Sequence, residues 1–268
     1  METPAGRTVA EVYNEPGMQW AVRGSGPHLH PGGEWATAEL AAKAAAAGFG
    51  FGGAVVDLAS ALGAPARFIA RRFTCRVICI DMDPRMHAAA VERHRAEELA
   101  RVIQPVLART EHLPLAGASV DGAWSQDALC HMEKEPVLAE VARVLKPGAM
   151  FAFTDFIARR GMTRRDELNL LRNWAFPSLF SIPRYVAELD ALGFEILLAE
   201  DRTDAVRQAR RGILPDEWQW WADFERRWGK AEAEARGEIG RTWQRLVRQG
   251  RGGYGMFLAR KPSSRRRR

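Results

Sequence analysis

The chain has 268 residues, 47% of them hydrophobic and 27% charged, which is the composition of a folded globular protein and excludes a largely disordered one. The formal net charge is +6, and Arg260, Lys261 and the run Arg265–Arg268 alone supply that many positive charges, so we expect a basic tail in solvent and no nucleic-acid partner. Three cysteines are too few for a disulfide framework, and no run of about eighteen uncharged apolar residues is present, so we expect a cytoplasmic protein without membrane contact.

The first segment, residues 1–34, contains three Gly-Pro or Pro-Gly steps and little periodicity, which predicts an irregular arm or lid. A helix should follow, with Glu34 or Thr37 in its first turn. The run 48–53 matches G-x-G-x-x-G by letter. It precedes the next predicted strand, whereas a phosphate-binding turn follows its strand, so we assign it no binding role.

The stretch Ala54–Gly63 is the centre of the predicted fold. A short β-branched run ends at an acid and small residues, and an amphipathic segment over 65–73 follows, which predicts strand, tight turn and helix. In an open parallel sheet a nucleotide-like ligand binds at such a turn. The second strand, Arg76–Asp81, also ends in an acid, which can accept both ribose hydroxyls of a nucleoside or, alternatively, begin the helix predicted over Pro84–Arg101.

Residues 57–67 read D-L-A-S-A-L-G-A-P-A-R, which resembles motif I of class I S-adenosylmethionine-dependent methyltransferases, D-L-G-S-G-L-G-G-P-A-R. Ala59 is a tolerated variant of this motif in the family. Two departures bear on cofactor binding: Ala61 replaces a glycine needed for close backbone approach to the cofactor, and Arg109 stands where the family carries an acid for the adenine amino group. The resemblance implies S-adenosylmethionine as the cofactor, with Met82 packed on adenine. The cofactor-binding residues that it implies are Asp57, Ala59, Ser60, Ala61, Gly63, Asp81, Met82, Thr110, Glu111 and Ser125.

The third strand is predicted over Pro105–Ala108 and the fourth begins at Val120. The loop after the fourth strand contains S-Q-D-A-L-C-H, which resembles the S-Q-D-A-x-x-H run of methyltransferases acting on sarcosine, dimethylglycine and related amines. The resemblance implies that Ser125, Gln126 and Asp127 contact the methionine end of the cofactor or the acceptor. His131 is the candidate base, with Gln126 beside it; the alternative is a helix-start histidine hydrogen-bonded to backbone.

The rest of the sequence predicts the remaining strands of the sheet and a helical cap. The segment 156–183 is too long for a plain crossover and predicts a helical cap, from which Arg172 and Trp174 would contact the acceptor. Tryptophans at helical spacing between 217 and 246 predict one or two long helices whose aromatics are mostly core. The other predicted elements are a helix over Val137–Leu145, a fifth strand over Met150–Asp155, a helix over Tyr185–Leu192, and strands over Phe194–Glu200 and Tyr254–Arg260.

The predicted fold is therefore an α/β, Rossmann-like, seven-stranded, mostly parallel sheet with helices on both faces, formed by residues 35–262, with 263–268 as a basic tail. The predicted activity is methyl transfer from S-adenosylmethionine to an N, O or C nucleophile of a small molecule, in secondary metabolism. The same scaffold also admits an elimination or cyclisation enzyme of natural-product biosynthesis, or a non-catalytic partner subunit, and a homo-oligomer is compatible with each. No histidine, cysteine and acid cluster has metal-ligand spacing, so we expect no metal.

Overall fold

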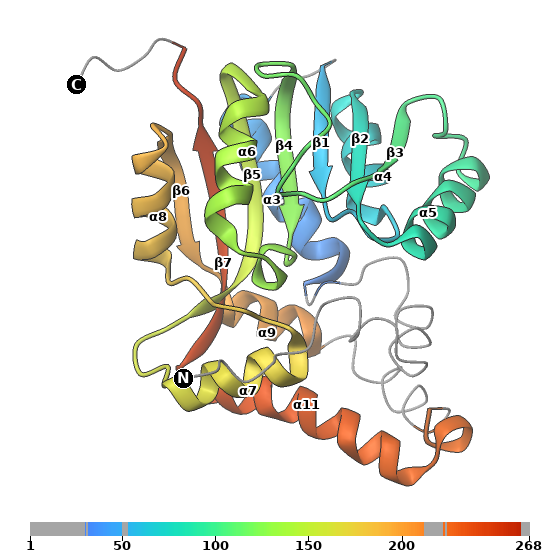
Figure 1. Cartoon of the computed structure of the whole chain (residues 1–268), viewed down its shortest axis with the longest axis vertical. Coiled ribbons are helices and arrows are strands. Elements are labelled where there is room, and N and C mark those ends of the chain that lie inside the picture. The colour runs from blue at the N-terminus through green and yellow to red at the C-terminus, as the bar shows by residue number, and fades with distance from the viewer. Residues whose placement is uncertain (1–29, 31, 50–52, 212–221, 223, 264–268) are drawn as a thin grey trace.

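The computed structural model describes residues 30, 32–49, 53–211, 222 and 224–263, and these form one seven-stranded sheet with helices on both faces (Figure 1). The strand order is β3-β2-β1-β4-β5-β7-β6, and β7 runs antiparallel to both of its neighbours. This confirms the predicted Rossmann-like architecture. The strands are β1 (Ala54–Leu58), β2 (Arg76–Asp81), β3 (Ile103–Leu107), β4 (Val120–Gln126), β5 (Leu145–Ala158), β6 (Glu195–Asp201) and β7 (Gly252–Arg260).

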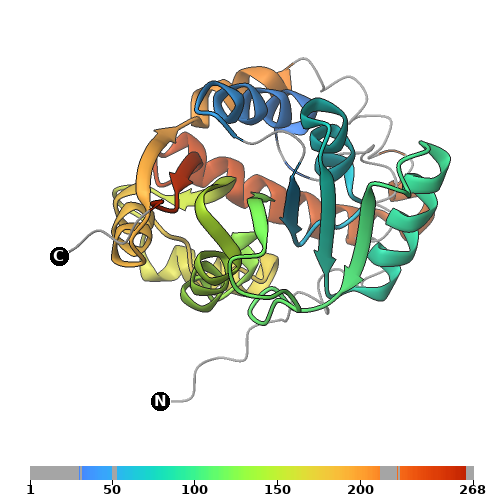
Figure 2. The same ribbon diagram turned by 90° about the horizontal axis from the view of Figure 1, so that it is seen from above.

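Two separate apolar layers hold the helices against the sheet (Figure 2). Helices α3 and α4 cover one face through residues such as Leu40 and Ile69, and α6 and α8 cover the other through residues such as Val141 and Leu189. The helices are α3 (Gly33–Ala46), α4 (Ala64–Phe73), α5 (Pro84–Ala96), α6 (Lys134–Val144), α7 (Arg164–Trp174), α8 (Ile182–Ala191), α9 (Thr203–Arg211) and α11 (Lys230–Arg248).

Local signals explain where several helices begin. Helix α5 starts with Asp83 as N-cap, whose carboxylate accepts from the Arg85 N–H, followed by Pro84 in the first turn. Helix α7 starts with a reciprocal capping box between Thr163 and Asp166. Gly193 follows α8 with φ +86°, the left-handed conformation with which glycine commonly ends a helix.

Two predicted boundaries were wrong, and one helix was not predicted. The helix predicted to reach Arg101 ends at Ala96, because Glu98 adopts a left-handed backbone with φ +59°. Strand β5 continues to Ala158 because β7 pairs with it as far as that residue. Helix α9 was not predicted.

A layer of helices lies beyond the carboxyl edge of the sheet, where α7 and α11 run side by side (Figure 1). Leu170 of α7 and Leu246 of α11 belong to one apolar cluster, and the Asp166 carboxylate pairs with Arg251 at 2.7 Å. Trp243 is a buried member of this cluster, as predicted for the aromatic segment. Of the segment predicted as the cap, residues 156–158 belong to β5 and residues 182–183 begin α8, so this layer consists of α7 together with α11. The proposed arm up to residue 29, Trp218, Trp220 and Trp221, and residues 264–268 lie outside the described residues.

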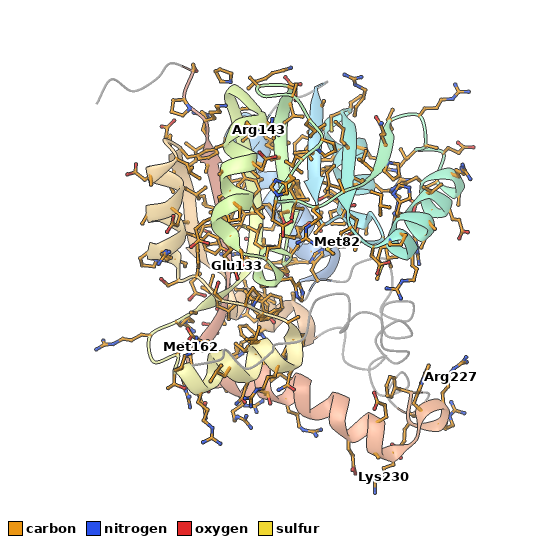
Figure 3. All side chains as sticks on the ribbon, in the orientation of Figure 1. Met82, Glu133, Arg143, Met162, Arg227 and Lys230 are labelled. Carbon is orange, nitrogen blue, oxygen red and sulfur yellow. The ribbon has the colours of Figure 1, made fainter. Side chains whose placement is uncertain are left out.

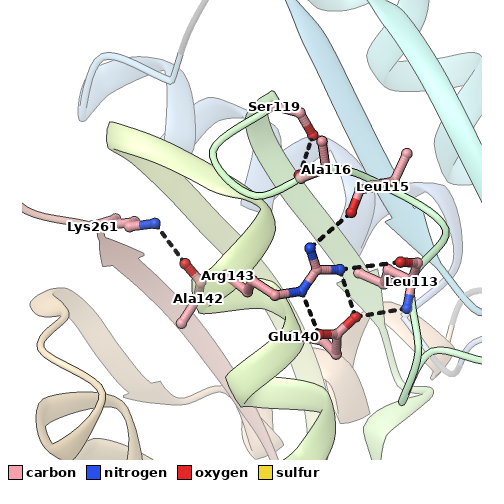
Figure 4. A network of polar contacts seen from close by, with 8 residues as sticks. All are labelled: Leu113, Leu115, Ala116, Ser119, Glu140, Ala142, Arg143 and Lys261. Atoms are coloured by element: carbon pink, nitrogen blue, oxygen red, sulfur yellow. Dashed lines mark hydrogen bonds and ion pairs between the residues drawn. The ribbon is translucent and has the colours of Figure 1, made fainter.

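At the opposite, amino edge of the sheet, Arg143 and Glu140 form a network of polar contacts with the backbone of Leu113 and Leu115, here called the clamp (Figure 4). The Arg143 guanidinium donates to the carbonyls of Leu113 and Leu115 at 3.1 and 2.8 Å, and it also pairs with Glu140. Glu140 in turn accepts from the Leu113 N–H at 2.7 Å. The clamp ties the loop between β3 and β4 to α6, away from the edge where the ligand site is expected.

Candidate functional site

A cavity of about 840 Å³ lies at the carboxyl edge of the sheet, a size typical of small-molecule sites. Its wall comes from the ends of β1 to β4, the start of α5 and the cap. Met82 and Glu133 lie at this edge, on the side that faces α7 and α11 (Figure 3). The predicted residues in the wall are Asp57, Ala59, Ser60, Ala61, Asp81, Met82, Thr110, Glu111, Gln126, Asp127 and His131.

Four predicted residues do not belong to the wall. Gly63 caps α4, and Ser125 is fully buried within β4. On α7 the wall residues are Leu171 and, just past the helix end, Ala175, which are four residues apart and so share a face, whereas Arg172 is exposed. The ring centroid of Trp174 lies 5.7 Å from that of Phe176, in the apolar cluster that joins α7 and α11. The sequence located the cap segment but not the face of α7 that meets the cavity.

The motif I turn keeps its shape although alanines replace its glycines. Ala59 and Ala61 adopt left-handed backbone with φ +49° and +45°. The Ser60 N–H donates to the Ile80 carbonyl at 3.0 Å, and the Ala61 N–H donates to Asp81 Oδ2 at 2.8 Å. These bonds tie the tips of β1 and β2 together, so the cost of the alanine conformations is offset by the surrounding structure.

We expect Ala61→Gly to raise the free energy of unfolding by about 1 kcal/mol, because a left-handed conformation costs alanine roughly 1–2 kcal/mol and glycine almost nothing. Urea denaturation measures the change. The matched control is Ala66→Gly in the middle of α4, a buried helical alanine, which should lower stability instead. A loss of stability in both variants would contradict the account of the turn.

Two carboxylates meet at this turn. Asp81 accepts backbone N–H groups of Ala61 and Asp83 at 2.8 and 2.9 Å, and burial raises its pKa. Asp57 is 2% exposed, its Oδ2 has no hydrogen-bond partner among the described residues, and burial followed by repulsion from Asp81 raises its pKa well above the ordinary value. A buried carboxylate without a donor is costly, so this site is built to receive a cationic or hydrogen-bonding ligand group.

Beneath the turn lies a histidine that sequence reasoning missed. A Cβ built on Gly63 would lie 2.4 Å from His94 Cε1, so this glycine is required by the ring as well as by its φ of +69°. His94 is 1% exposed, and neither ring nitrogen has a hydrogen-bond partner among the described residues. Burial, and then the positive charge of Arg67, lower its pKa to about 4.

This histidine predicts a loss of stability in acid. In the unfolded chain it binds a proton below about pH 6.5, whereas the folded chain resists protonation until about pH 4. Stability should therefore fall as pH drops from 6.5 to 4, by up to about 3 kcal/mol from this residue. His94→Leu should flatten the pH dependence of the melting temperature over this window. Equal slopes in the two proteins would contradict the assignment.

The tip of β4 carries an amide whose orientation is fixed by its partners. Thr37 Oγ1 and Trp124 Nε1 both donate to Gln126 Oε1, at 2.9 and 3.1 Å. Gln126 Nε2 is buried and has no partner among the described residues. Gln126 can therefore offer a hydrogen-bond donor to a ligand in the cavity. His30, also in the wall, bonds Thr37 at 3.2 Å and extends this network.

His131 joins the β4 loop to the cap. Its ring lies edge-on to Phe176 at 4.9 Å, and it is partly buried in the cavity wall. Burial lowers its pKa to about 4, although hydrogen bonds with the backbone of Ala175 and Trp174 oppose the shift. The ring is therefore neutral at pH 7. Both predicted roles, a base and a backbone-bonded histidine, are compatible with this geometry.

Asp127 shares the same end of the cavity. Its φ of +51° is unusual for a non-glycine residue. Burial, and then the neighbouring Asp155 carboxylate, raise its pKa to about 7. Asp155 is held by the Cys130 N–H at 2.9 Å and by the Tyr185 hydroxyl, so it anchors the β4 loop to α8.

The histidine, cysteine and acidic side chains described form no group of three that could hold a metal ion. Among the helices described, none is both long and apolar enough to cross a membrane.

Comparisons with known proteins agree with this geometry. A methyltransferase domain family matches residues 56–153. The dimethylglycine N-methyltransferase of Parasynechococcus marenigrum (strain WH8102) is 32% identical over 217 residues, which is 79% of this chain and 76% of that protein. The glycine/sarcosine/dimethylglycine N-methyltransferase of Actinopolyspora halophila is 32% identical over 56% of this chain, which spans only 27% of that relative. The [4+2]-cyclase SpnF has the same fold, with a TM-score of 0.79 at 22% identity over 97% of this chain and 98% of that one.

Proposed function

The chain belongs to the S-adenosylmethionine-dependent methyltransferases of small-molecule type, and from this membership we propose that it methylates a small-molecule acceptor in secondary metabolism. The observation that carries the proposal is the intact turn between β1 and α4, where the Ala61 N–H donates to Asp81 at 2.8 Å and Asp57 Oδ2 has no hydrogen-bond partner among the described residues. Two left-handed alanines and a buried carboxylate without a hydrogen-bond donor each cost free energy. Their presence together supports a turn that still binds its ligand.

The cavity suits the cofactor in charge and in polar groups. Asp81 would accept the ribose hydroxyls, Met82 and Thr110 would border the adenine, and Asp57 would face the positively charged methionine end. When bound, S-adenosylmethionine supplies an electrophilic methyl group on a positively charged sulfur. Asp57 and Asp81 would hold the cofactor by its positive charge and its hydroxyl groups, and the cavity wall would orient the two reactants.

The acceptor would lie between the β4 loop and the cap. Gln126 would donate a hydrogen bond to it, while Leu171 and Ala175 would cover its apolar part and exclude water. His131 is neutral at pH 7 and borders the same space, so it would accept a proton from the acceptor nucleophile through a ring nitrogen.

The cyclase likeness is a likeness of fold, and it does not favour an elimination or cyclisation over methyl transfer. Ala61 and Arg109 depart from the family's cofactor-binding pattern, and a cofactor site disrupted by them would favour those alternatives. Ala61 preserves the turn, and Arg109 is paired with Glu111 at 3.0 Å, which leaves the rest of the wall undisturbed. Neither departure therefore supports a lost cofactor site.

Calorimetric titration with S-adenosylmethionine and S-adenosylhomocysteine tests the proposal. We expect both to bind with one site per chain. A folded protein that binds neither would contradict the proposed function, and a gain of binding in Ala61→Gly alone would show that the turn has degenerated. Binding without methyl transfer to any acceptor offered, but with conversion of an unmethylated substrate, would favour the cyclisation or elimination reading.

A further inference from the structure

The two ends of the cavity differ in charge. At the cofactor end, Arg85 and Arg109 lie in the wall, and each is paired with an adjacent carboxylate, Asp83 and Glu111 respectively. At the acceptor end, formed by the β4 loop and α7, the described wall residues include no lysine or arginine.

Within the described part of the chain, the carboxyl groups at the acceptor end have no cationic partner. Asp127 and Glu133 both line this end, and neither has a lysine or arginine within ion-pair distance among the described residues. Asp127 provides no positive charge whether or not it is protonated. His131 is neutral at pH 7 and provides none either.

The cations nearest to this end in sequence are engaged elsewhere. Lys134 is fully buried, and its ammonium group donates to the Ser178 carbonyl at 2.7 Å and lies 5.2 Å from the Phe180 ring. Its positive charge also reaches the His131 ring, but it acts on the buried Asp155 carboxylate, which opposes it. Arg172 is exposed and absent from the wall. An acidic group on an acceptor would therefore lose its water without gaining a counter-charge from these residues, which is unfavourable.

We propose that the acceptor carries no acidic group: it is a neutral or cationic, largely apolar small molecule. The inference rests on the proposed function, because it concerns the acceptor end of the same cavity. It also separates this chain from the dimethylglycine N-methyltransferase that it resembles, whose named acceptor is a carboxylic acid. Sequence similarity alone would have assigned that acceptor.

A matched pair of fluorescent probes tests the charge preference directly. N-phenyl-1-naphthylamine is neutral, and 8-anilinonaphthalene-1-sulfonate has the same rings with a sulfonate added. In the full chain saturated with S-adenosylhomocysteine, we expect the neutral probe to bind at least tenfold more tightly. Equal or tighter binding of the sulfonate would overturn the proposal, and so would the absence of binding by the neutral probe.

Two leucine substitutions show whether the preference arises in the cavity. Leu171→Arg places a cation in the acceptor wall and should reduce the ratio of the two affinities at least tenfold. Leu192→Arg makes the same change at an exposed position after α8 and should leave the ratio within twofold. An equal change of the ratio in both variants would place the probes outside the cavity and overturn the proposal. If Leu171→Arg does not fold, the conservative Glu133→Gln is the deciding variant. It removes a negative charge from the cavity wall and should lower the ratio of the affinity for the neutral probe to that for the sulfonate. An unchanged ratio would overturn the proposal.

A matched pair of acceptors provides the second readout. Turnover of dimethylglycine is compared with that of dimethylaminoethanol, in which a neutral hydroxymethyl group replaces the carboxylate. Preference for the acid would overturn the inference while leaving methyl transfer established. Failure to bind S-adenosylhomocysteine would instead reject the proposed function, and the probe ratio can still be measured in the unliganded protein.

Discussion

Replacing Asp81 by alanine should weaken binding of S-adenosylhomocysteine at least tenfold. A carboxylate that receives ribose hydroxyls contributes about 1.5 to 3 kcal/mol, since hydrogen bonds to charged groups are the strong ones. In this chain Asp81 also accepts the N–H groups of Ala61 and Asp83, so the alanine variant loosens the turn as well. Asp81→Asn keeps the shape of the side chain and isolates the loss of charge.

The control for this experiment is the neighbouring carboxylate. Asp83 caps α5 and pairs with Arg85, so Asp83→Asn should weaken binding far less than Asp81→Asn. Isothermal titration with circular dichroism measures affinity and folding together. Affinity should also fall in acid, because burial raises the pKa of Asp81 and the protonated form accepts one hydroxyl fewer. A folded Asp81→Ala with unchanged affinity would remove Asp81 from the site.

The central strands could be predicted because their residue types strongly favour one secondary structure. Strand β2 has the predicted bounds, Arg76–Asp81, since an apolar β-branched run ends at an acid and a proline-initiated helix follows. The acids at the strand tips could be placed for the same reason: in a parallel sheet the carboxyl ends meet at one edge. Asp57 and Asp81 are accordingly both in the cavity wall.

The features of the site that the sequence did not predict depend on contacts between segments that are distant in the chain. The sequence gives no sign that His94 lies against Gly63, because one residue is on α5 and the other begins α4. The pattern of α7 is apolar on more than one side, so it does not tell which of Leu171 and Arg172 meets the cavity. The left-handed conformations of Ala59 and Ala61 could not be predicted either, since alanine ordinarily avoids that conformation.

Replacing His131 by alanine should lower turnover by about two orders of magnitude while leaving cofactor affinity nearly intact, the usual contribution of a positioned base. The proposed cofactor contacts lie at the tips of β1 to β3, whereas His131 lies past β4, against Phe176 of the cap. His131→Gln keeps hydrogen bonding to the backbone but removes the basic nitrogen. A base role predicts that glutamine does not rescue turnover, and a positioning role predicts that it does.

The pH profile separates these roles again. A base must be unprotonated, and the pKa of His131 is lowered to about 4. Turnover of the unaltered protein should therefore not vary with the protonation of His131 near neutral pH, and should fall only as pH drops toward 4. If His131 only supports the cap, His131→Ala should raise the acceptor Michaelis constant, lower the melting temperature and leave the acid limb in place. A loss of turnover of only a few-fold would mean that holding the acceptor in line with the methyl group provides most of the catalysis, as expected for an acceptor that is already an unprotonated nucleophile.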